Sequence, residues 1–415
     1  MEQILSVPVY VLLFLTLYFE VFLIVTYWEH RHQFAMDPAP EIPPEKYLSV
    51  TIIVPAWNEE HTLARTIDSL LALDYPKEKL RILIIDDGST DRTYEVAQSY
   101  ANPPFVRVLR KTNGGKHTAM NLGIAMATTD LVGCLDADSF VDRNALKEIV
   151  SYFGQEDVMA VTPSVQIHHP GTFIRRIQAV EYMIGEFTRK IFSRFNGLYV
   201  TPGPFSIYRR VVFEKIGGFV HGYGTEDMEM AMRMQANHMR IENAHTALVF
   251  TVSPSSYRAL YKQRVRWVTG FLKNTFYTYR YMFFNKKYGN LGMLTMPFAF
   301  LSIFIALFFS LQYLYVIYTN IEERIIRYSV LGFRFNPSWP TFDLFTFNLE
   351  FRRLLIYVLL GITIAFVLGG SYMATRRWHL SRNMLYFLFF YGLLAPWWLM
   401  KSVYNLVTSK EAPWR

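Results

Sequence analysis

Apolar residues are concentrated in four long runs near the two ends of the chain. The runs cover Val7–Trp28, Leu291–Thr319, Leu354–Thr375 and Met384–Val407. Each is long enough to cross a bilayer, because a spanning helix needs about 20 residues. The first run lacks the basic start and the small-residue cleavage site of a signal peptide. The pattern therefore predicts a membrane protein with one N-terminal span and about three C-terminal spans.

The region between these runs has a different pattern, in which short β-branched apolar runs alternate with helix-like stretches. A proline-rich linker within residues 29–48 precedes it, since proline favours extended backbone. Alternating strands and helices predict an α/β fold, with a doubly wound, mostly parallel sheet covered by helices on both faces. The predicted strands are VTIIV at Val50, RILIID at Arg81, VRVL at Val106, LVGCLD at Leu131 and MAVTPSV at Met159.

Two later helical stretches, Thr172–Phe195 and Tyr257–Phe284, mix Arg and Lys with aromatic and aliphatic residues. We interpret both as amphipathic helices that lie on the cytoplasmic leaflet. The alternative is a solvated basic face on an ordinary domain helix. The predicted organisation is an N-terminal transmembrane helix (1–28), a linker (29–48), a soluble domain (49–252), interfacial helices (253–290) and a C-terminal transmembrane region (291–415).

Charge suggests an orientation for these segments. The chain has a net charge of +8 with 52% hydrophobic residues, which favours positive cytoplasmic flanks and anionic lipid over nucleic acid as partners. If the soluble domain is cytoplasmic, alternation places Asn320–Arg353 outside and the basic loop at Arg376 inside. Pro396 could divide the last run, which leaves the side of the C-terminus open. Cys134 is the only cysteine, which excludes an intrachain disulfide and a thiolate metal cluster.

Two pairs of carboxylates follow predicted strands. Asp86 and Asp87 end RILII, and Asp136 and Asp138 end LVGCL. Ligands of doubly wound sheets bind beyond the carboxyl ends of the strands. Hard oxygen ligands beside a diphosphate suit Mg²⁺ or Mn²⁺. Together the pairs predict a site for a nucleoside diphosphate and a metal ion, although either pair alone could be an ordinary surface turn.

Three further segments carry candidate chemistry. In NGGKHTAMN, two glycines precede a helix that begins near Lys116, and its amides and lysine could bind phosphate. Glu226 and Asp227 in GYGTEDME are either a helix cap or a source of the base that a hydroxyl nucleophile requires. In QRVRW, from Gln263 to Trp267, the arginines could stabilise a departing diphosphate and the indole could stack on a sugar ring, unless the segment is simply a membrane-surface helix.

In this order and spacing, the motifs resemble the family 2 processive glycosyltransferases, which include the cellulose, chitin, hyaluronan and poly-N-acetylglucosamine synthases. The resemblance covers nearly the whole chain and implies a GT-A catalytic domain at the cytoplasmic face of the cell membrane. It assigns the nucleotide-sugar donor to the residues of the DDGS, GGK and DAD motifs and of the segment after the first strand. These donor residues are Pro55, Asn58, Glu59, Asp86, Asp87, Lys116 and Asp136.

The resemblance also implies roles in catalysis. Asp138, with Asp136, would ligate the metal, and Asp227 beside Glu226 would be the general base. The TPGPFSIYRR segment would approach the acceptor sugar. The residues assigned to the acceptor end are Gly203, Pro204, Gln263, Arg266 and Trp267.

The activity implied is inverting transfer of a sugar, with N-acetylglucosamine from UDP-GlcNAc as the best candidate, onto a growing saccharide that is then exported. Accessory export or modifying proteins are compatible with this role. One departure is VTGFLKN after QRVRW, where poly-N-acetylglucosamine synthases usually have an AQG-like segment. The alternatives are a single addition to a polyprenyl phosphate or diacylglycerol acceptor, and a transport component that binds nucleotide sugar without turnover.

Overall fold

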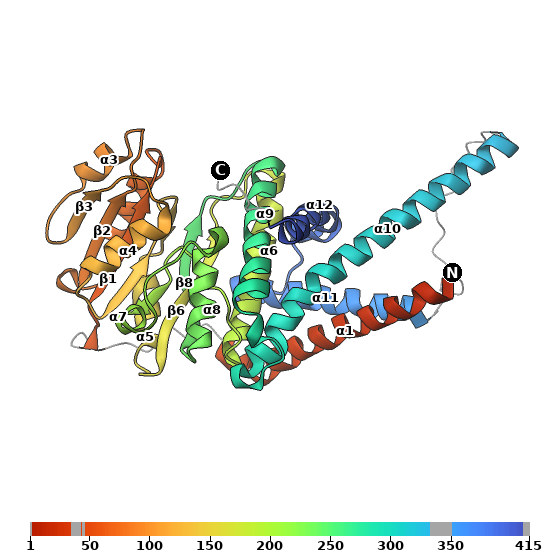
Figure 1. Ribbon diagram of the computed structural model, residues 1–415, viewed down its shortest axis with the longest axis horizontal. Coiled ribbons are helices and arrows are strands. Elements are labelled where there is room, and N and C mark those ends of the chain that lie inside the picture. Colours follow the sequence, from red (N-terminus) through yellow and green to blue (C-terminus); the bar gives the residue numbers. More distant parts are fainter. Residues whose placement is uncertain (1, 35–42, 44–45, 333–350, 410–415) are drawn as a thin grey trace.

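The computed structural model describes residues 2–34, 43, 46–332 and 351–409 (Figure 1). Much of the predicted linker, part of the predicted outside loop between Asn320 and Arg353, and the basic Lys410 and Arg415 therefore lie outside the described residues. The remaining chain has two regions, a domain built on one sheet and a set of long helices that extends away from it (Figure 1).

One sheet forms the centre of the domain, in the order β3-β2-β1-β4-β7-β6-β8-β5. Strands β3, β2, β1 and β4 are mutually parallel, as are β6 and β8, while β7 is antiparallel to both of its neighbours and β5 is antiparallel to β8. The strands are β1 (Val50–Ala56), β2 (Leu80–Asp86), β3 (Val106–Arg110), β4 (Leu131–Cys134), β5 (Ser139–Val141), β6 (Val158–Ile167), β7 (Ile207–Arg209) and β8 (Arg240–Thr251).

The predicted α/β fold with a mostly parallel sheet is confirmed, and all five predicted strands form. The sheet is mixed, however, because the three-residue β7 inserts antiparallel between β4 and β6, and the three-residue β5 pairs antiparallel with β8. A strand this short leaves no alternating pattern in the sequence. Every residue of β1 is buried, as expected for a parallel strand covered on both faces.

Helices cover both faces of the sheet. One face packs on α2, α3 and α5, and the other on α4, α6, α7 and α8, which gives two apolar clusters separated by the sheet. The helices are α1 (Glu2–Glu29), α2 (Leu63–Leu71), α3 (Thr93–Ser99), α4 (Lys116–Met126), α5 (Ala145–Tyr152), α6 (Phe173–Arg194), α7 (Arg210–Ile216), α8 (Glu226–Ala236), α9 (Tyr257–Lys273), α10 (Met296–Leu331), α11 (Phe351–Thr375) and α12 (Arg382–Val407).

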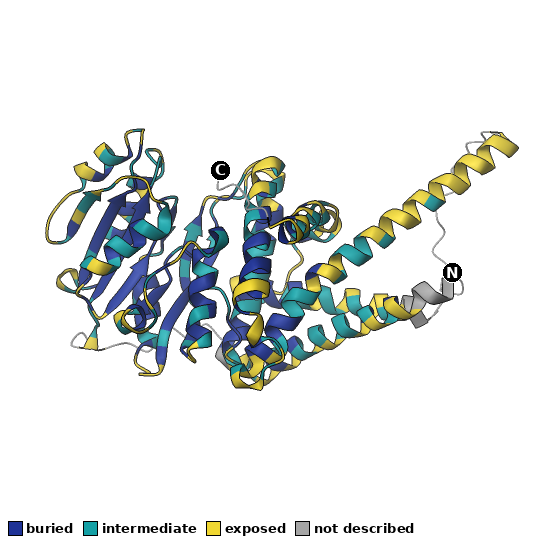
Figure 2. Ribbon diagram, viewed as in Figure 1, coloured by how far each residue is buried: buried dark blue, intermediate teal, exposed yellow. Residues whose placement is uncertain are grey.

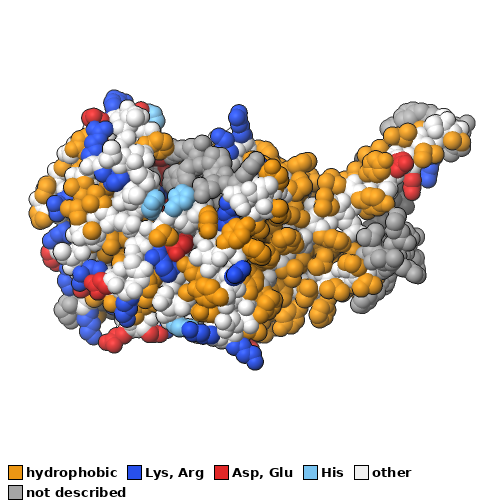
Figure 3. Space-filling model, in the orientation of Figure 1, with side chains coloured by type: hydrophobic (Ala, Val, Ile, Leu, Met, Phe, Trp, Pro, Cys, Tyr) orange, Lys and Arg blue, Asp and Glu red, His pale blue; other side chains and the backbone are white. Residues whose placement is uncertain are grey.

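Four helices are long and apolar enough to cross a membrane, namely α1, α10 with the turn before it, α11 and α12. Figure 1 shows α1, α10 and α11 running away from the sheet, whereas α12 stays beside α6 and α9. The extended helices are largely exposed (Figure 2), and apolar side chains cover them while charged groups gather over the sheet (Figure 3). Such an apolar surface needs lipid. Pro396 lies inside a continuous α12, so it does not divide the helix.

Candidate active site

A cavity of about 520 Å³ opens between the sheet and the helices α6, α8 and α9. Its volume is in the range of small-molecule sites. The structure brings ten of the predicted residues to this one cavity, although they come from five separate segments of the chain. They are Lys116, Asp136, Asp138, Gly203, Pro204, Glu226, Asp227, Gln263, Arg266 and Trp267.

At the sheet end of the cavity, the carboxylates of Asp136 and Asp138, which follow β4, lie near Lys116, the first residue of α4. Lys116 Nζ lies 2.5 Å from Asp136 Oδ1 and 3.6 Å from Glu226 Oε1. Although burial opposes the charge, Asp136 and Glu226 hold the pKa of Lys116 above its ordinary value. Gly203 packs closely beside them, because a Cβ at that position would lie 2.7 Å from Lys116 Nζ and the lysine side chain would have to shift. This end therefore carries one fixed positive charge among several carboxylates.

Asp136 and Asp138 could bind a divalent cation whose remaining ligands come from a substrate and from water. Burial and the neighbouring Asp136 raise the pKa of Asp138 to about 6, which marks a carboxylate short of positive charge. Within the described ranges, no group of three or more His, Cys, Asp or Glu side chains could hold a metal. Two hard oxygens suit Mg²⁺ or Mn²⁺, because these ions commonly complete their shells with phosphate oxygens and water.

The candidate base lies at the start of α8. The Asp227 amide carbonyl accepts a hydrogen bond from Thr201 Oγ1 at 2.8 Å, and Asp227 Oδ1 accepts one from the Met228 amide at 2.9 Å. Burial, followed by the charge of Glu226, raises the pKa of Asp227 to about 6. A carboxylate with this pKa is ionised at neutral pH, yet it is more basic than an ordinary aspartate. The geometry therefore suits proton abstraction.

The opposite end of the cavity is built from α9. Arg266 Nη1 donates to the Gly224 carbonyl at 2.8 Å, which ties α9 to the turn that precedes the base. The Arg264 guanidinium lies 4.3 Å from the Trp267 ring centre and donates to Glu181 Oε2 at 2.8 Å. Among the described residues, Gln263 Oε1 and Arg264 Nε are buried without a hydrogen-bond partner. These two atoms lie beneath the cavity wall, so a ligand would reach them only if the side chains turned.

Five predicted donor residues do not line this cavity, namely Pro55, Asn58, Glu59, Asp86 and Asp87. Asp86 pairs with Arg110 at 3.1 Å. The Asp87 carboxylate accepts hydrogen bonds from the Gly114 and Gly115 amides, at 3.1 and 2.9 Å. The amides that the sequence assigned to phosphate thus hold Asp87, because the Gly-Gly turn folds back onto the end of β2.

The segment after β1 is bound to the same end of the sheet. The Asn58 amide donates to Ser89 Oγ at 3.0 Å, and the Asn58 side-chain carbonyl accepts from the Thr90 amide at 2.9 Å. The charge of Glu59 contributes to the raised pKa of Asp138, which places Glu59 near the cavity. The donor roles of these five residues stay predictions.

One wall of the cavity was not predicted. Glu181, Tyr182, Gly185, Thr188, Arg189 and Phe192 all line it from α6. These residues recur at the spacing of a single helix face, so helical periodicity could have identified them as one surface. What the sequence did not contain was the information that this face turns toward the carboxylates rather than toward solvent.

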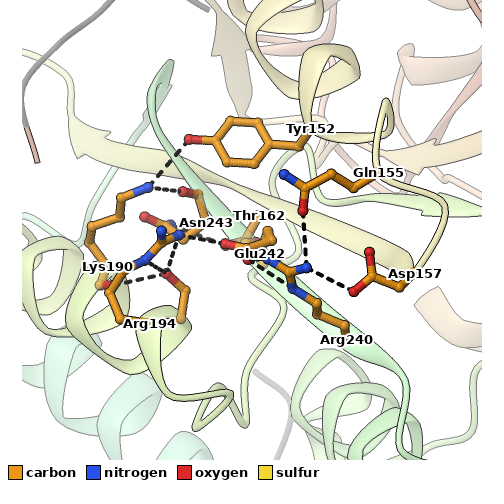
Figure 4. A network of polar contacts seen from close by, with 10 residues as sticks. Tyr152, Gln155, Asp157, Thr162, Lys190, Arg194, Arg240, Glu242 and Asn243 are labelled. Atoms are coloured by element: carbon orange, nitrogen blue, oxygen red, sulfur yellow. Dashed lines mark hydrogen bonds and ion pairs between the residues drawn. The ribbon is translucent and has the colours of Figure 1, made fainter. Parts of the chain in front are cut away.

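A buried polar network holds α6 on the sheet (Figure 4). Lys190 Nζ donates to the Asn243 carbonyl of β8 at 2.9 Å, and Arg194 pairs with Glu242 at 2.7 Å. Glu242 also pairs with Arg240 at 2.5 Å. Burial, with the charge of Arg194, lowers the pKa of Lys190 to about 7. These contacts fix the position of the α6 wall relative to the strands.

Comparison with known proteins gives a consistent assignment. Residues 51–217 match the profile of glycosyl transferase family 2. Poly-beta-1,6-N-acetyl-D-glucosamine synthase of Staphylococcus aureus strain COL is 30% identical over 261 residues, which is 62% of this chain and 63% of that protein. The enzyme of the same name from Staphylococcus epidermidis is 30% identical over 225 residues, 53% of this chain and 54% of that protein.

A solved mannosyltransferase from Pyrobaculum calidifontis, in complex with GDP-Man and Mn²⁺, has a similar fold. The TM-score is 0.55 at 16% identity, and the match covers 97% of this chain and 100% of that one. The resemblance inferred from the motifs is thereby confirmed, as is the GT-A type of fold. Residues 51–217 thus match the glycosyl transferase family 2 model, in a chain that has four helices long and apolar enough to cross a membrane among its described residues.

Proposed function

We propose that this protein is an inverting membrane glycosyltransferase that extends a saccharide, with N-acetylglucosamine from UDP-GlcNAc as its donor sugar. The single observation that carries the proposal is the shared cavity. It gathers two candidate metal ligands, a candidate base and the QxxRW residues at one place. The donor sugar is inferred from the names of the staphylococcal relatives, of which the alignment spans less than two thirds.

The donor would bind at the sheet end of the cavity. Asp136 and Asp138 would hold Mg²⁺ or Mn²⁺, which when bound neutralises charge that develops on the departing diphosphate. Lys116 presents a fixed positive charge beside them and would contact the phosphates. The enclosed carboxylates and lysine are held by ion pairs already formed in the protein, so little reorganisation is needed during transfer.

The acceptor would bind at the α9 end. Trp267 would offer an apolar face for a sugar ring, and Gln263 and Arg264, which line the cavity beside it, would turn to bond the hydroxyls of that ring. Asp227 takes the proton of the attacking hydroxyl as a bond forms to the anomeric carbon and the bond to the diphosphate breaks. A single displacement of this kind inverts the anomeric configuration.

The test is release of nucleoside diphosphate by the detergent-purified, full-length protein. A panel of nucleotide sugars is offered with Mg²⁺ or Mn²⁺, and the products are sized by mass spectrometry. A ladder of N-acetylglucosamine oligomers is the expected result. One sugar on a lipid would replace the proposal with single addition, and binding without turnover would indicate a transport component.

Asp227→Asn separates chemistry from binding in the same assay. We expect kcat to fall by about 10²- to 10⁴-fold, the usual contribution of a general base, while donor affinity changes little. Asp68→Asn on the exposed side of α2 is the matched control and should keep full activity. Turnover that survives in Asp227→Asn would remove this residue from the mechanism.

A further inference from the structure

We propose that Asn274 and Tyr279, two residues of the segment that follows α9, are positioning residues for the candidate base Asp227. Both side chains are buried, and both of these described residues lie outside the lining of the cavity. They are called here the clamp residues, because they hold α8 on either side of Asp227. The inference rests on the proposed function, since it takes Asp227 as the base.

The turn before α8 has a backbone conformation that needs support. Gly222, Tyr223 and Gly224 have φ angles of 52°, 55° and 79°, so three successive residues lie in the left-handed region. A tyrosine is disfavoured there, and such a conformation persists only where surrounding contacts maintain it. Helix α8 begins two residues after this turn, and Asp227 is its second residue. The position of the candidate base therefore depends on what holds the turn.

The turn is held from the side of α9. Asn274 Nδ2 donates to the Gly222 carbonyl at 2.9 Å, and Arg266 Nη1 donates to the Gly224 carbonyl at 2.8 Å. Asn274 is only 1% exposed, so water does not compete for its hydrogen bond. The carbonyls on both sides of Tyr223 are thus fixed by one segment of the chain, α9 and the residue directly after it.

Thr225, the residue at the start of α8, is bound by the same asparagine. A threonine at this position usually accepts a hydrogen bond from an amide of the first helical turn, but Thr225 makes no such bond. Its hydroxyl instead donates to the Gly222 carbonyl at 2.8 Å and accepts from Asn274 Nδ2 at 3.1 Å. Gly270 lets α9 approach this closely, because a Cβ there would overlap the Thr225 side chain. The start of α8 is therefore fixed by α9.

Tyr279 holds α8 beyond the base. Its hydroxyl donates to Glu229 Oε1 at 2.7 Å, while Glu229 Oε2 pairs with Arg233 at 2.7 Å. Glu229 is buried, so its carboxylate depends on these partners for its charge. Asn274 binds two residues before Asp227 in the chain and Tyr279 binds two residues after it. The first turn of α8 is thus anchored at both ends.

A local change in the helix allows both clamp residues to reach α8. Asn274–Thr278 form a π-helical turn, in which the Tyr279 amide donates to the Asn274 carbonyl at 2.8 Å. In a regular α-helix the residues that share a face are three or four apart, so residues 274 and 279 would point in different directions. The wider turn brings their side chains to one partner. Such turns are rare, and they are frequent at functional sites.

This arrangement joins the base to the acceptor end of the cavity. Helix α9 carries Arg266 and Trp267 and continues directly into the clamp residues. If α9 shifts relative to the sheet, α8 is carried with it, so the separation between Asp227 and a sugar bound on Trp267 is preserved. The donor carboxylates Asp136 and Asp138 belong to the sheet and are not held by this segment. Loss of the clamp should therefore slow transfer without weakening donor binding.

The test compares Asn274→Ala and Tyr279→Phe with the wild type as detergent-purified, full-length proteins. Calorimetry gives the donor Kd and the number of donor-binding sites, and kcat is expressed per site, so unfolded protein does not contribute. We expect kcat to fall about 100-fold in Asn274→Ala, because a small misplacement of a reacting group has this effect. In Tyr279→Phe it should fall about tenfold. The donor Kd should stay unchanged in both.

Two matched controls separate positioning from general stability. Asn237→Ala removes an exposed asparagine at the other end of α8, whose Nδ2 donates to the Arg233 carbonyl at 2.8 Å. Tyr281→Phe removes an exposed hydroxyl two residues after Tyr279. Both should keep the wild-type kcat per site. An unchanged kcat per site in Asn274→Ala, or a loss of donor affinity equal to the loss of kcat, would overturn the inference.

Hydrogen exchange gives a readout that does not need turnover. The amides of residues 222–229 should exchange faster in Asn274→Ala than in the wild type, and those of Asn237→Ala should exchange at the wild-type rate in this segment. If the wild-type protein transferred no sugar, the proposed function would fail while this measurement still reported on the clamp. Equal exchange in wild type and Asn274→Ala would show that Asn274 does not hold the turn.

Discussion

The two ends of the cavity are held in different ways. At the donor end, Asp136 and Asp138 follow a buried strand, and Lys116 and Gly203 are packed against them by contacts within the sheet domain. At the acceptor end, Trp267 is held through Arg264 of α9 and Glu181 of α6. The donor end therefore depends on the sheet and its loops, and the acceptor end depends on how α6 and α9 pack together.

This difference suggests why one catalytic domain can serve different acceptors. A sheet edge is rigid because its backbone bonds are shared with neighbouring strands, so it suits an invariant nucleotide. Helices that pack through side chains can shift with small changes of sequence. Variation in the acceptor would then be accommodated on the membrane side, with the donor chemistry left intact.

Among changes to substrate binding, the largest effect is expected at the donor end. Asp138→Ala removes one of two candidate metal ligands, so metal-dependent donor affinity should fall by at least about 100-fold. Isothermal titration with the nucleotide sugar, with and without Mn²⁺, measures the change. Asp68→Ala on α2 is the control and should bind normally. Equal affinity for wild type and Asp138→Ala in the presence of Mn²⁺ would exclude Asp138 from the metal site.

Lowering the pH should affect donor binding and proton transfer separately. Asp227 and Asp138 both have pKa values raised to about 6 by burial, so both become protonated as the pH falls through 6. Protonated Asp227 cannot accept the acceptor proton, and kcat should fall about tenfold per pH unit below 6. Bound metal lowers the pKa of its ligand. Saturating Mn²⁺ should therefore abolish the loss of donor affinity at low pH, but it should not prevent the fall in kcat. A kcat that stays flat to pH 5 would contradict the base assignment.

Gly203→Ala tests the close packing at the donor end. The new methyl group would lie 2.7 Å from Lys116 Nζ and 3.1 Å from Asp136 Oδ2, so the ion pair must move. We expect the donor KM to rise about tenfold, equivalent to about 1.4 kcal/mol. Gly185→Ala, on the α6 wall, meets no atom within 4 Å and serves as the control. Unchanged steady-state kinetics for both variants would show that the lysine need not be fixed.

The smallest effect is expected from Tyr391→Phe at the acceptor end. This variant removes the hydrogen bond from α12 to Glu181 and frees the carboxylate that positions Arg264 over Trp267. The acceptor KM should rise about fivefold, or about 1 kcal/mol, with donor affinity unchanged. Glu181→Gln should shift the same constant, whereas Tyr386→Phe on the same helix should not. A fall in kcat alone would argue against a positioning role for Tyr391.

Local pattern predicted much of the catalytic domain. The strands at Val50, Arg81 and Val106 are strong β-branched runs, and their carboxyl ends had to meet at one edge once the sheet was parallel. The motif residues were likewise visible, because acidic residues after strands and an arginine-tryptophan pair are local features. Their gathering around one cavity followed from the resemblance and not from spacing alone.

Other features had no local signal. Strand β7 is too short to show periodicity, and its antiparallel insertion depends on partners far away in the chain. The Asp87 carboxylate accepts hydrogen bonds from the Gly114 and Gly115 amides, because the turn brings these groups within hydrogen-bonding distance. The sequence showed those amides but not the neighbour that occupies them.

By itself, the sequence determined that this protein joins an α/β domain to long apolar helices and carries motifs that resemble those of family 2 glycosyltransferases. These properties are set by residue type and short-range periodicity. Tertiary structure decided which face of α6 lines the cavity, which carboxylates remain accessible, and that α12 packs along α6 and α9. Each depends on contacts between separate segments of the chain, and the hydropathy of one segment contains no information about them.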